Sequence, residues 1–204
     1  LLAEGKTVAD VCRELEVAEQ TYYRWRNQYG GMKADDAKRL KELEHLGYSF
    51  EGAEASFQLL SRKVRGDHTP YFSLHGFTVL IDKRDVNDEE PRCEASIRVD
   101  VGGQHEHTAA SGNGPVNALD TALRKALLRF YPSLAETSLS DYKVRVLTGE
   151  HAGTGSVIRV QVETTDGTDT WGTVGASANV IEASYQALVD AAEYKLLKDG
   201  VQPL

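Results

Sequence analysis

The feature that most constrains the fold is a pattern written twice in the C-terminal two thirds of the chain. Residues 107–123 read HTAASGNGPVNALDTAL, and residues 171–188 read WGTVGASANVIEASYQAL. One constant offset aligns the two stretches. The aligned pairs are Thr108 and Thr173, Ala118 and Ala183, Ala122 and Ala187, and Leu123 and Leu188. A repeated small unit indicates two halves related by a pseudo-twofold axis, which is a natural place for a ligand or a second subunit.

Alternating apolar residues upstream of each copy predict three strands before each helix. FTVLI from Phe77 matches YKVRV from Tyr142, and IRVDV from Ile97 matches IRVQV from Ile158. Pro115 stands where the first turn of a helix tolerates proline. The sequence therefore predicts an α+β fold with duplicated βββα units. The expected strands are residues 71–82, 93–101, 104–110, 138–147, 155–165 and 170–177, and the expected helices are residues 115–131 and 179–197.

The first 44 residues predict short helices. Thr7 is a suitable N-cap for a helix with apolar residues at helical spacing, and a second helix with Tyr22 and Trp25 on one face follows after Val17. Two short helices joined by a tight turn fit either a helix-turn-helix or a plain helical hairpin. In the first case the residues offered to a DNA groove are Glu19, Gln20, Thr21, Tyr23 and Arg24.

Residues 45–70 predict a linker. Phe50, Ala53, Phe57 and Leu60 recur at helical spacing, which indicates a helix of about four turns that closes near Gly66. A hinge with Pro70 at its end follows. The expected domains are therefore residues 1–44, 45–70 and 71–204.

Composition excludes several classes of function. The formal net charge of -8 argues against nucleic-acid binding by the whole surface, although a locally basic helix could still bind weakly. Cys12 and Cys93 are the two cysteines and lie far apart, which fits a reducing, cytoplasmic compartment. The sequence holds no apolar run near 18 residues, so we expect no membrane partner.

The residues show no constellation for catalysis. Ser111 and Ser184 lack a recognisable base. His105 and His107 point to one face of a strand, but no third ligand stands at suggestive spacing, so we expect no metal and no cofactor. A structural or effector-facing role is expected for this histidine pair.

The N-terminal 44 residues, with the string TYYRWRNQYGG, resemble the helix-turn-helix protein encoded by the first reading frame of bacterial insertion sequences, the DNA-end-binding part of a transposase. The helix that normally precedes the pair and the leucine zipper that normally follows are both missing here. The resemblance therefore implies a truncated unit with weak DNA binding.

The strings GYSFEGAEASFQLL, EHTAASGNGPVNALDTALRKAL, DYKVRVL and WGTVGASANVIEASYQALVDAAEYKLLKD resemble the C-terminal regulatory domain of the 2-isopropylmalate synthase family, most closely its citramalate synthase branch. In that family the domain dimerises and binds leucine or isoleucine, which inhibits a separate acyltransferase barrel. The resemblance implies a homodimer and an effector pocket. Its implied residues are Gly112, Asn113, Gly114, Pro115, Asn117, Ala118, Ala178, Asn179 and Ile181.

The chemistry of these residues agrees with an amino-acid ligand. Two glycines allow a ligand to approach the backbone, and the helix that follows presents unpaired amides to a carboxylate. Apolar strand faces can hold a branched side chain. The alternative is that GNGP is only a strand-to-helix turn.

Three functions follow from these expectations. The first is an allosteric and dimerisation module for isoleucine or leucine; the second is an amino-acid-responsive DNA-binding protein; the third is a fusion fragment without a role of its own. A catalytic barrel needs about 250 residues, so we expect no synthase activity from this chain alone and no catalytic residues. The choice of effector and the parent reaction stay open.

Overall fold

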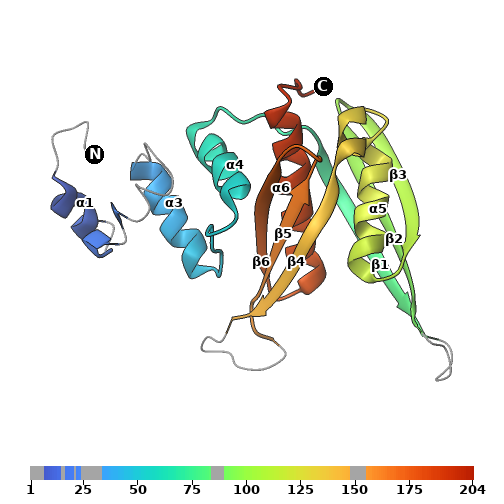
Figure 1. Cartoon of the computed structure of the whole chain (residues 1–204), viewed down its shortest axis with the longest axis horizontal. Coiled ribbons are helices and arrows are strands. Elements are labelled where there is room, and N and C mark those ends of the chain that lie inside the picture. The colour runs from blue at the N-terminus through green and yellow to red at the C-terminus, as the bar shows by residue number, and fades with distance from the viewer. Residues whose placement is uncertain (1–6, 15–16, 21, 24–33, 84–89, 148–154) are drawn as a thin grey trace.

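The computed structural model describes residues 7–14, 17–20, 22–23, 34–83, 90–147 and 155–204. Within these residues, helices α1, α3 and α4 come before two units of three strands and a helix (Figure 1). The N-terminal helices are α1 (Val8–Glu14), α3 (Ala34–His45) and α4 (Glu54–Arg65). The first unit holds β1 (Ser73–Asp82), β2 (Arg92–Val101), β3 (Gln104–Gly112) and α5 (Pro115–Leu127). After the 3-10 helix η2 (Pro132–Glu136), the second holds β4 (Ser138–Val146), β5 (Ile158–Thr165), β6 (Thr170–Ser177) and α6 (Val180–Lys198).

The two units have the same topology, which confirms the predicted α+β duplication. Each forms an antiparallel three-stranded sheet, in the order β1-β2-β3 or β4-β5-β6. Helix α5 packs on β2 and β3, and α6 packs on β5 and β6. The two helices also contact each other and begin at the same end of the molecule (Figure 1).

The register of the sheets corrects one sequence match. Ile97 of β2 pairs with Thr108, and Val162 of β5 pairs with Thr173. Val162, and not Ile158, is therefore the counterpart of Ile97. The match between IRVDV and IRVQV is four residues out of register and comes from the similar alternation of the two strands. The match between Phe77 and Tyr142 is confirmed, because these residues pair with Ile97 and Val162.

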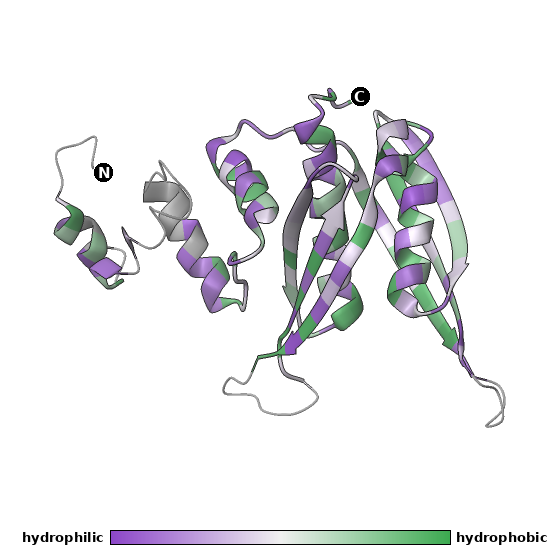
Figure 2. Cartoon of the chain, in the orientation of Figure 1, coloured by the Kyte–Doolittle hydropathy of each residue, from purple (hydrophilic) through white to green (hydrophobic). Residues whose placement is uncertain are grey.

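The main core lies between the first sheet and the helices. Alternate residues of β2 are buried on its helix side, where Ile97 and Val101 are fully enclosed. They meet the apolar stripe of α5, in which Leu119 and Ala122 are also fully enclosed. Apolar and polar residues are interspersed along both elements (Figure 2), and the apolar residues are the buried ones.

Helix α4 is shorter than the sequence predicts. Residues 48–53 are not helical, because Gly47 and Gly52 take positive φ values of 101° and 71° that a right-handed helix excludes. The helix does end at Gly66, as predicted, in a left-handed conformation. It also packs on α6 and on the edge strand β6, and so it covers the β6 edge of the second sheet. The hydroxyl of Ser56 joins these elements by accepting from the Val174 amide and donating to Asp190.

Helices α1 and α3 precede α4 in the chain, and α3 contacts α4. Thr7 and Asp10 cap α1 reciprocally, at 3.2 Å for each backbone amide, as the predicted N-cap requires. Cys12 and Tyr22 are buried in an apolar cluster that continues to Phe50 and Phe57. Most of the predicted second helix, with Trp25, lies outside the described residues. Within the described part of the chain, no helix has both the length and the apolar character needed to cross a membrane.

Candidate functional site

The loop between β3 and α5 is closed by a tight contact at Gly112. A Cβ atom at this position would lie 2.5 Å from the backbone nitrogen of Ala118 and 2.5 Å from Oδ1 of Asn117. The same Oδ1 accepts a hydrogen bond of 3.1 Å from the amide of Asn113. Glycine is therefore required for the loop to fold back against the first turn of α5.

The start of α5 has no side-chain cap. Its N-cap residue is Gly114, in an extended conformation with φ of -163°, and Pro115 follows in the first turn. A Cβ atom added to Gly114 would meet no atom within 4 Å, so space is open beside the helix start. The first-turn amides of Val116 and Asn117 thus receive no acceptor from the N-cap, and they carry the positive end of the helix dipole.

The start of α6 is different. Oδ1 of Asn179 accepts hydrogen bonds from the amides of Ile181 at 2.9 Å and Glu182 at 3.4 Å. The protein itself therefore supplies a hydrogen-bond acceptor for these two first-turn amides of α6. Ala178 and Asn179 are exposed, whereas Ile181 packs partly against the main core.

The structure places the predicted effector residues in two groups at the same end of the molecule. Gly112 to Ala118 form one loop and helix start, and Ala178 to Ile181 form the other (Figure 1). Ala118 is fully buried in the main core, so its side chain packs inside the protein.

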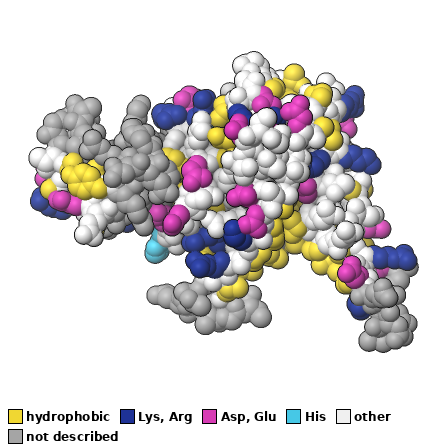
Figure 3. All heavy atoms as spheres, viewed as in Figure 1, with side chains coloured by type: hydrophobic (Ala, Val, Ile, Leu, Met, Phe, Trp, Pro, Cys, Tyr) yellow, Lys and Arg dark blue, Asp and Glu magenta, His cyan; other side chains and the backbone are white. Residues whose placement is uncertain are grey.

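An exposed apolar surface lies between the two arms formed by β1–β2 and β4–β5. Figure 3 shows hydrophobic side chains gathered in the hollow between these arms. On the helix-facing sides of β1 and β4, toward the end where α5 and α6 begin, Ile81, Val144 and Val146 are 55%, 48% and 57% exposed. A single copy of the chain therefore leaves apolar area uncovered at the end where both helices begin.

A small enclosed cavity lies elsewhere, between α5, η2 and α6. Leu123, Leu134 and Thr137 contribute to its lining, and none of the nine predicted effector residues does. Its free volume of about 20 Å³ is close to the room that one water molecule requires, so it cannot hold an amino acid. Sequence reasoning missed this cavity, because its walls come from both copies of the repeat.

A charged cluster, in which Glu193 is buried and Lys63 reaches the surface, fixes α4 against α6. Nζ of Lys63 lies 3.4 Å from Asp190 and 3.5 Å from Glu193, and Nε2 of His68 lies 3.2 Å from Glu193. Burial raises the pKa of both carboxyl groups, and it lowers the pKa of His68. Burial alone would lower the pKa of Lys63, but Asp190 and Glu193 together raise it. These contacts stabilise the position of α4, and they were missed because the partners are far apart in sequence.

Of the predicted DNA-facing residues, Glu19, Gln20 and Tyr23 are exposed in the structure. Thr21 and Arg24 lie outside the described residues.

Comparison with protein families identifies the domain. The family model described as LeuA allosteric (dimerisation) domain matches residues 51–196. The chain belongs to this family. The match includes α4, part of which lies in the string GYSFEGAEASFQLL that carried the resemblance. A second family model, described as Transposase, matches residues 1–46.

Curated relatives agree with both matches. The (R)-citramalate synthases of Geobacter sulfurreducens and Aquifex aeolicus are 58% and 54% identical over 161 residues, which are 79% of this chain. The matched residues make up 30% of each relative, so this chain spans less than a third of the length of these two relatives. Low calcium response locus protein S of Yersinia pestis is 44% identical over 55 residues, 27% of this chain and 62% of that protein.

Proposed function

We propose that the chain is an allosteric module that binds a branched-chain amino acid, isoleucine or leucine, at the start of α5. The observation that supports this most is the difference between the two helix starts. The first turn of α5 lacks a side-chain cap and is bordered by Gly112 and Gly114, whereas Asn179 caps α6. Only one of the two repeats thus offers its helix start to a carboxylate.

The ligand's two ends would meet different surroundings. Its carboxylate would accept hydrogen bonds from the amides of Val116 and Asn117, in a geometry worth up to about 2 kcal/mol. Its branched side chain would lie on the apolar surface of the hollow, where burial contributes about 1.5–3 kcal/mol. Asn113, Pro115 and Ala178 would border the ligand. We propose that Ala118, being buried, holds the loop in place instead of contacting the ligand.

A second copy of the chain would complete the pocket. The hollow is open in one copy (Figure 3). Ile81, Val144 and Val146 are exposed on the helix-facing sides of β1 and β4, the strands that border it. An isologous dimer would cover this apolar area and enclose a ligand that a single copy leaves in contact with solvent. Within a longer synthase, such a dimer would carry the inhibitory signal to a catalytic barrel supplied by other residues.

Isothermal titration calorimetry with isoleucine, leucine and alanine tests the proposal. We expect saturable binding of one branched-chain ligand and at least tenfold weaker binding of alanine. Gly114→Val should abolish the heat without unfolding the chain, because its side chain enters the open space beside α5. Asn179→Ala should keep binding, although the loss of the cap costs about 1 kcal/mol of stability. Equal affinity of Gly114→Val and wild type would contradict the proposed pocket.

A second candidate function is DNA binding by the N-terminal helices, because a transposase family matches residues 1–46 and Gln20 and Tyr23 are exposed. A gel shift at low salt with an insertion-sequence end tests it. We expect only weak binding that disappears at physiological salt, because the chain carries a formal net charge of -8. Nanomolar affinity would favour this second function.

A further inference from the structure

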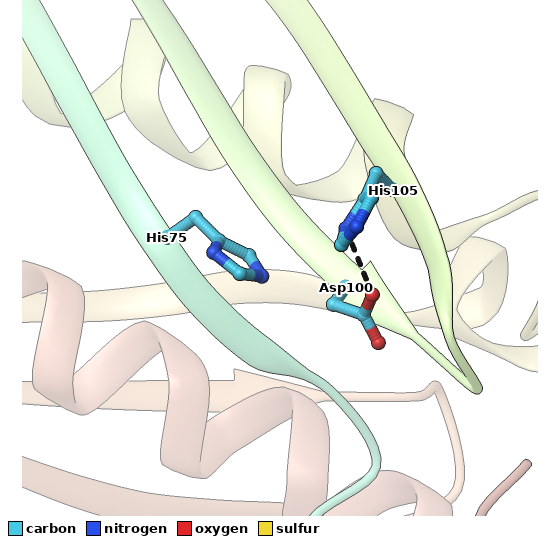
Figure 4. A group of neighbouring side chains, drawn as sticks. All are labelled: His75, Asp100 and His105. Atoms are coloured by element: carbon cyan, nitrogen blue, oxygen red, sulfur yellow. Dashed lines mark ion pairs between the residues drawn. The ribbon is translucent and has the colours of Figure 1, made fainter.

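Three side chains from neighbouring strands converge on the outer face of the first sheet, away from α5. They are His75 of β1, Asp100 of β2 and His105 of β3 (Figure 4). One potential ligand atom from each lies within 4.8 Å of the other two. Nδ1 of His105 is 2.9 Å from Oδ2 of Asp100, and the rings of His75 and His105 lie 5.2 Å apart.

The backbone explains why these residues meet. Asp100 and His105 are a cross-strand pair beside the turn at Gly102 and Gly103. The pairing of β1 with β2 shifts between Leu74 and Gly76, so His75 is the extra residue of a β-bulge. Gly76, with φ of 150°, allows this irregular backbone. The bulge brings the His75 side chain beside the pair on the neighbouring strands (Figure 4).

The carboxylate of Asp100 is already oriented. Its Oδ1 accepts a hydrogen bond of 2.9 Å from the amide of Gly103, and its Oδ2 faces His105. The side chain of Asp100 is 21% exposed and that of His105 is 76% exposed. One ligand is thus fixed by the turn, while the exposed imidazole can rotate to close the distance to a bound ion.

The second repeat has the same bulge without these side chains. Its register shifts between Leu139 and Asp141, which makes Ser140 the counterpart of His75. The hydroxyl of Ser140 on β4 donates to the backbone carbonyl and to the carboxylate of Glu163 on the neighbouring strand β5. The positions that correspond to Asp100 and His105 hold Thr165 and Thr170, which also pair with each other. The fold therefore forms the bulge without histidine, so folding alone does not require the three ligand-type residues of the first repeat.

We propose that His75, Asp100 and His105 bind a divalent late first-row cation such as Zn²⁺. Two imidazole nitrogens and one carboxylate oxygen suit zinc, nickel or copper better than magnesium or calcium, which prefer oxygen ligands. Water would occupy the remaining coordination position. The ion would join all three strands of the first sheet at one end. Its ligand set differs from the His105-x-His107 pair considered from the sequence, because His107 lies opposite Arg98 and outside the group.

One nearby charge opposes the ion. Arg98 lies on the same face of β2 as Asp100, and its guanidinium is 3.3 Å from the position that a Cβ atom at Gly76 would take. Its positive charge lowers the affinity for a cation. Arg98→Ala should therefore bind zinc more tightly than the wild type does.

Zinc calorimetry on the full, tag-free chain after treatment with a chelator tests the proposal. We expect one Zn²⁺ per chain, with affinity at least tenfold lower in each of His75→Ala, Asp100→Asn and His105→Ala. His107→Ala, one pair along the same strands, is the matched control and should bind within about twofold of wild type. Melting curves in chelator should coincide for the wild type and the three histidine variants, because these histidines are exposed. Adding zinc should raise the midpoint only where binding persists.

Other results overturn the site. These are a wild-type chain that takes up no zinc, ligand variants that bind as the wild type does, or a His107→Ala variant that is weakened as much as His105→Ala. If a ligand variant fails to fold, Arg98→Ala still decides, because a gain in zinc affinity is expected only when the ion sits on this face of the sheet.

Discussion

The hydroxyl of Thr108 donates a hydrogen bond of 2.7 Å to the backbone carbonyl of Ala122. Thr173 makes the same bond, at 2.8 Å, to Ala187 in the second unit. Each bond joins the third strand of a unit to the middle of its own helix. The repeat seen in the sequence is thus a repeat of a specific tertiary contact, which sets how each helix lies on its sheet.

Thr173→Val should destabilise the chain by about 1 kcal/mol, because it removes this hydrogen bond while keeping the shape of the side chain. Thr173 is fully buried, so water cannot replace the lost bond. Urea denaturation measures the change. Thr170→Val on the exposed start of β6 is the control and should stay within about 0.5 kcal/mol of wild type. Equal effects of the two substitutions would show that the contact contributes nothing.

Gly112→Ala and Gly114→Ala should differ sharply although the glycines are two residues apart. The first places a Cβ atom 2.5 Å from the Ala118 nitrogen, and the backbone must shift at a cost of about 1–3 kcal/mol. The second meets open space, so its stability should change by less than about 1 kcal/mol. Thermal melts of the two variants test this. A larger loss at Gly114 would mean that the loop packs differently.

Asp166→Asn should lower stability at neutral pH and lose this effect in acid. Hydrogen bonds from Lys198 first, and also from the Asp169 amide and Lys195, hold the pKa of Asp166 well below its usual range. A depressed carboxyl pKa stabilises the fold above the unfolded value of about 3.9, and this stabilisation disappears as pH falls towards the folded value. The difference between the melting midpoints of wild type and variant should therefore shrink progressively as pH falls below about 3.9. A constant difference from pH 7 to pH 2 would contradict this role.

Ile81→Asp should prevent dimerisation, whereas Leu80→Asp should not. These neighbours are 55% and 56% exposed, but they lie on opposite faces of β1, and only Ile81 is on the side of the hollow. A buried carboxylate would be costly at an apolar interface. Sedimentation velocity distinguishes the two. Dimers of Ile81→Asp, or monomers of Leu80→Asp, would place the interface on another surface.

The sequence predicted the helices well, since α5 carries clear apolar periodicity and α5 and α6 begin beside Pro115 and Asn179. It matched β5 to β2 four residues out of register. An even shift keeps every side chain on the same face of a strand, so the apolar pattern fits both registers equally well. Gly47 and Gly52 were the sequence signal that α4 would be short, because glycine favours the positive φ values that both residues take. The helical spacing of Phe50 and Phe57 pointed to a longer helix.

The candidate sites were predictable to different degrees. The Gly112–Ala118 loop was predictable because a family pattern covers it within one short stretch. The capping difference between the helices was not, because it depends on Asn179, which the resemblance implied only as an effector residue. The group of His75, Asp100 and His105 was missed, since a β-bulge changes which residues share a face. Its available signals were Gly76 after His75 and the Gly-Gly turn between Asp100 and His105.

The most direct test of the effector site is a titration of the ¹⁵N-labelled chain with isoleucine and leucine, followed through backbone amide shifts. We predict saturable shifts at Val116 and Asn117, the amides that no N-cap side chain satisfies, and smaller shifts at Ile181 and Glu182, which Asn179 already holds. Shifts confined to the cavity around Leu134 and Thr137, or no shift at the start of α5 with either amino acid, would contradict the assignment.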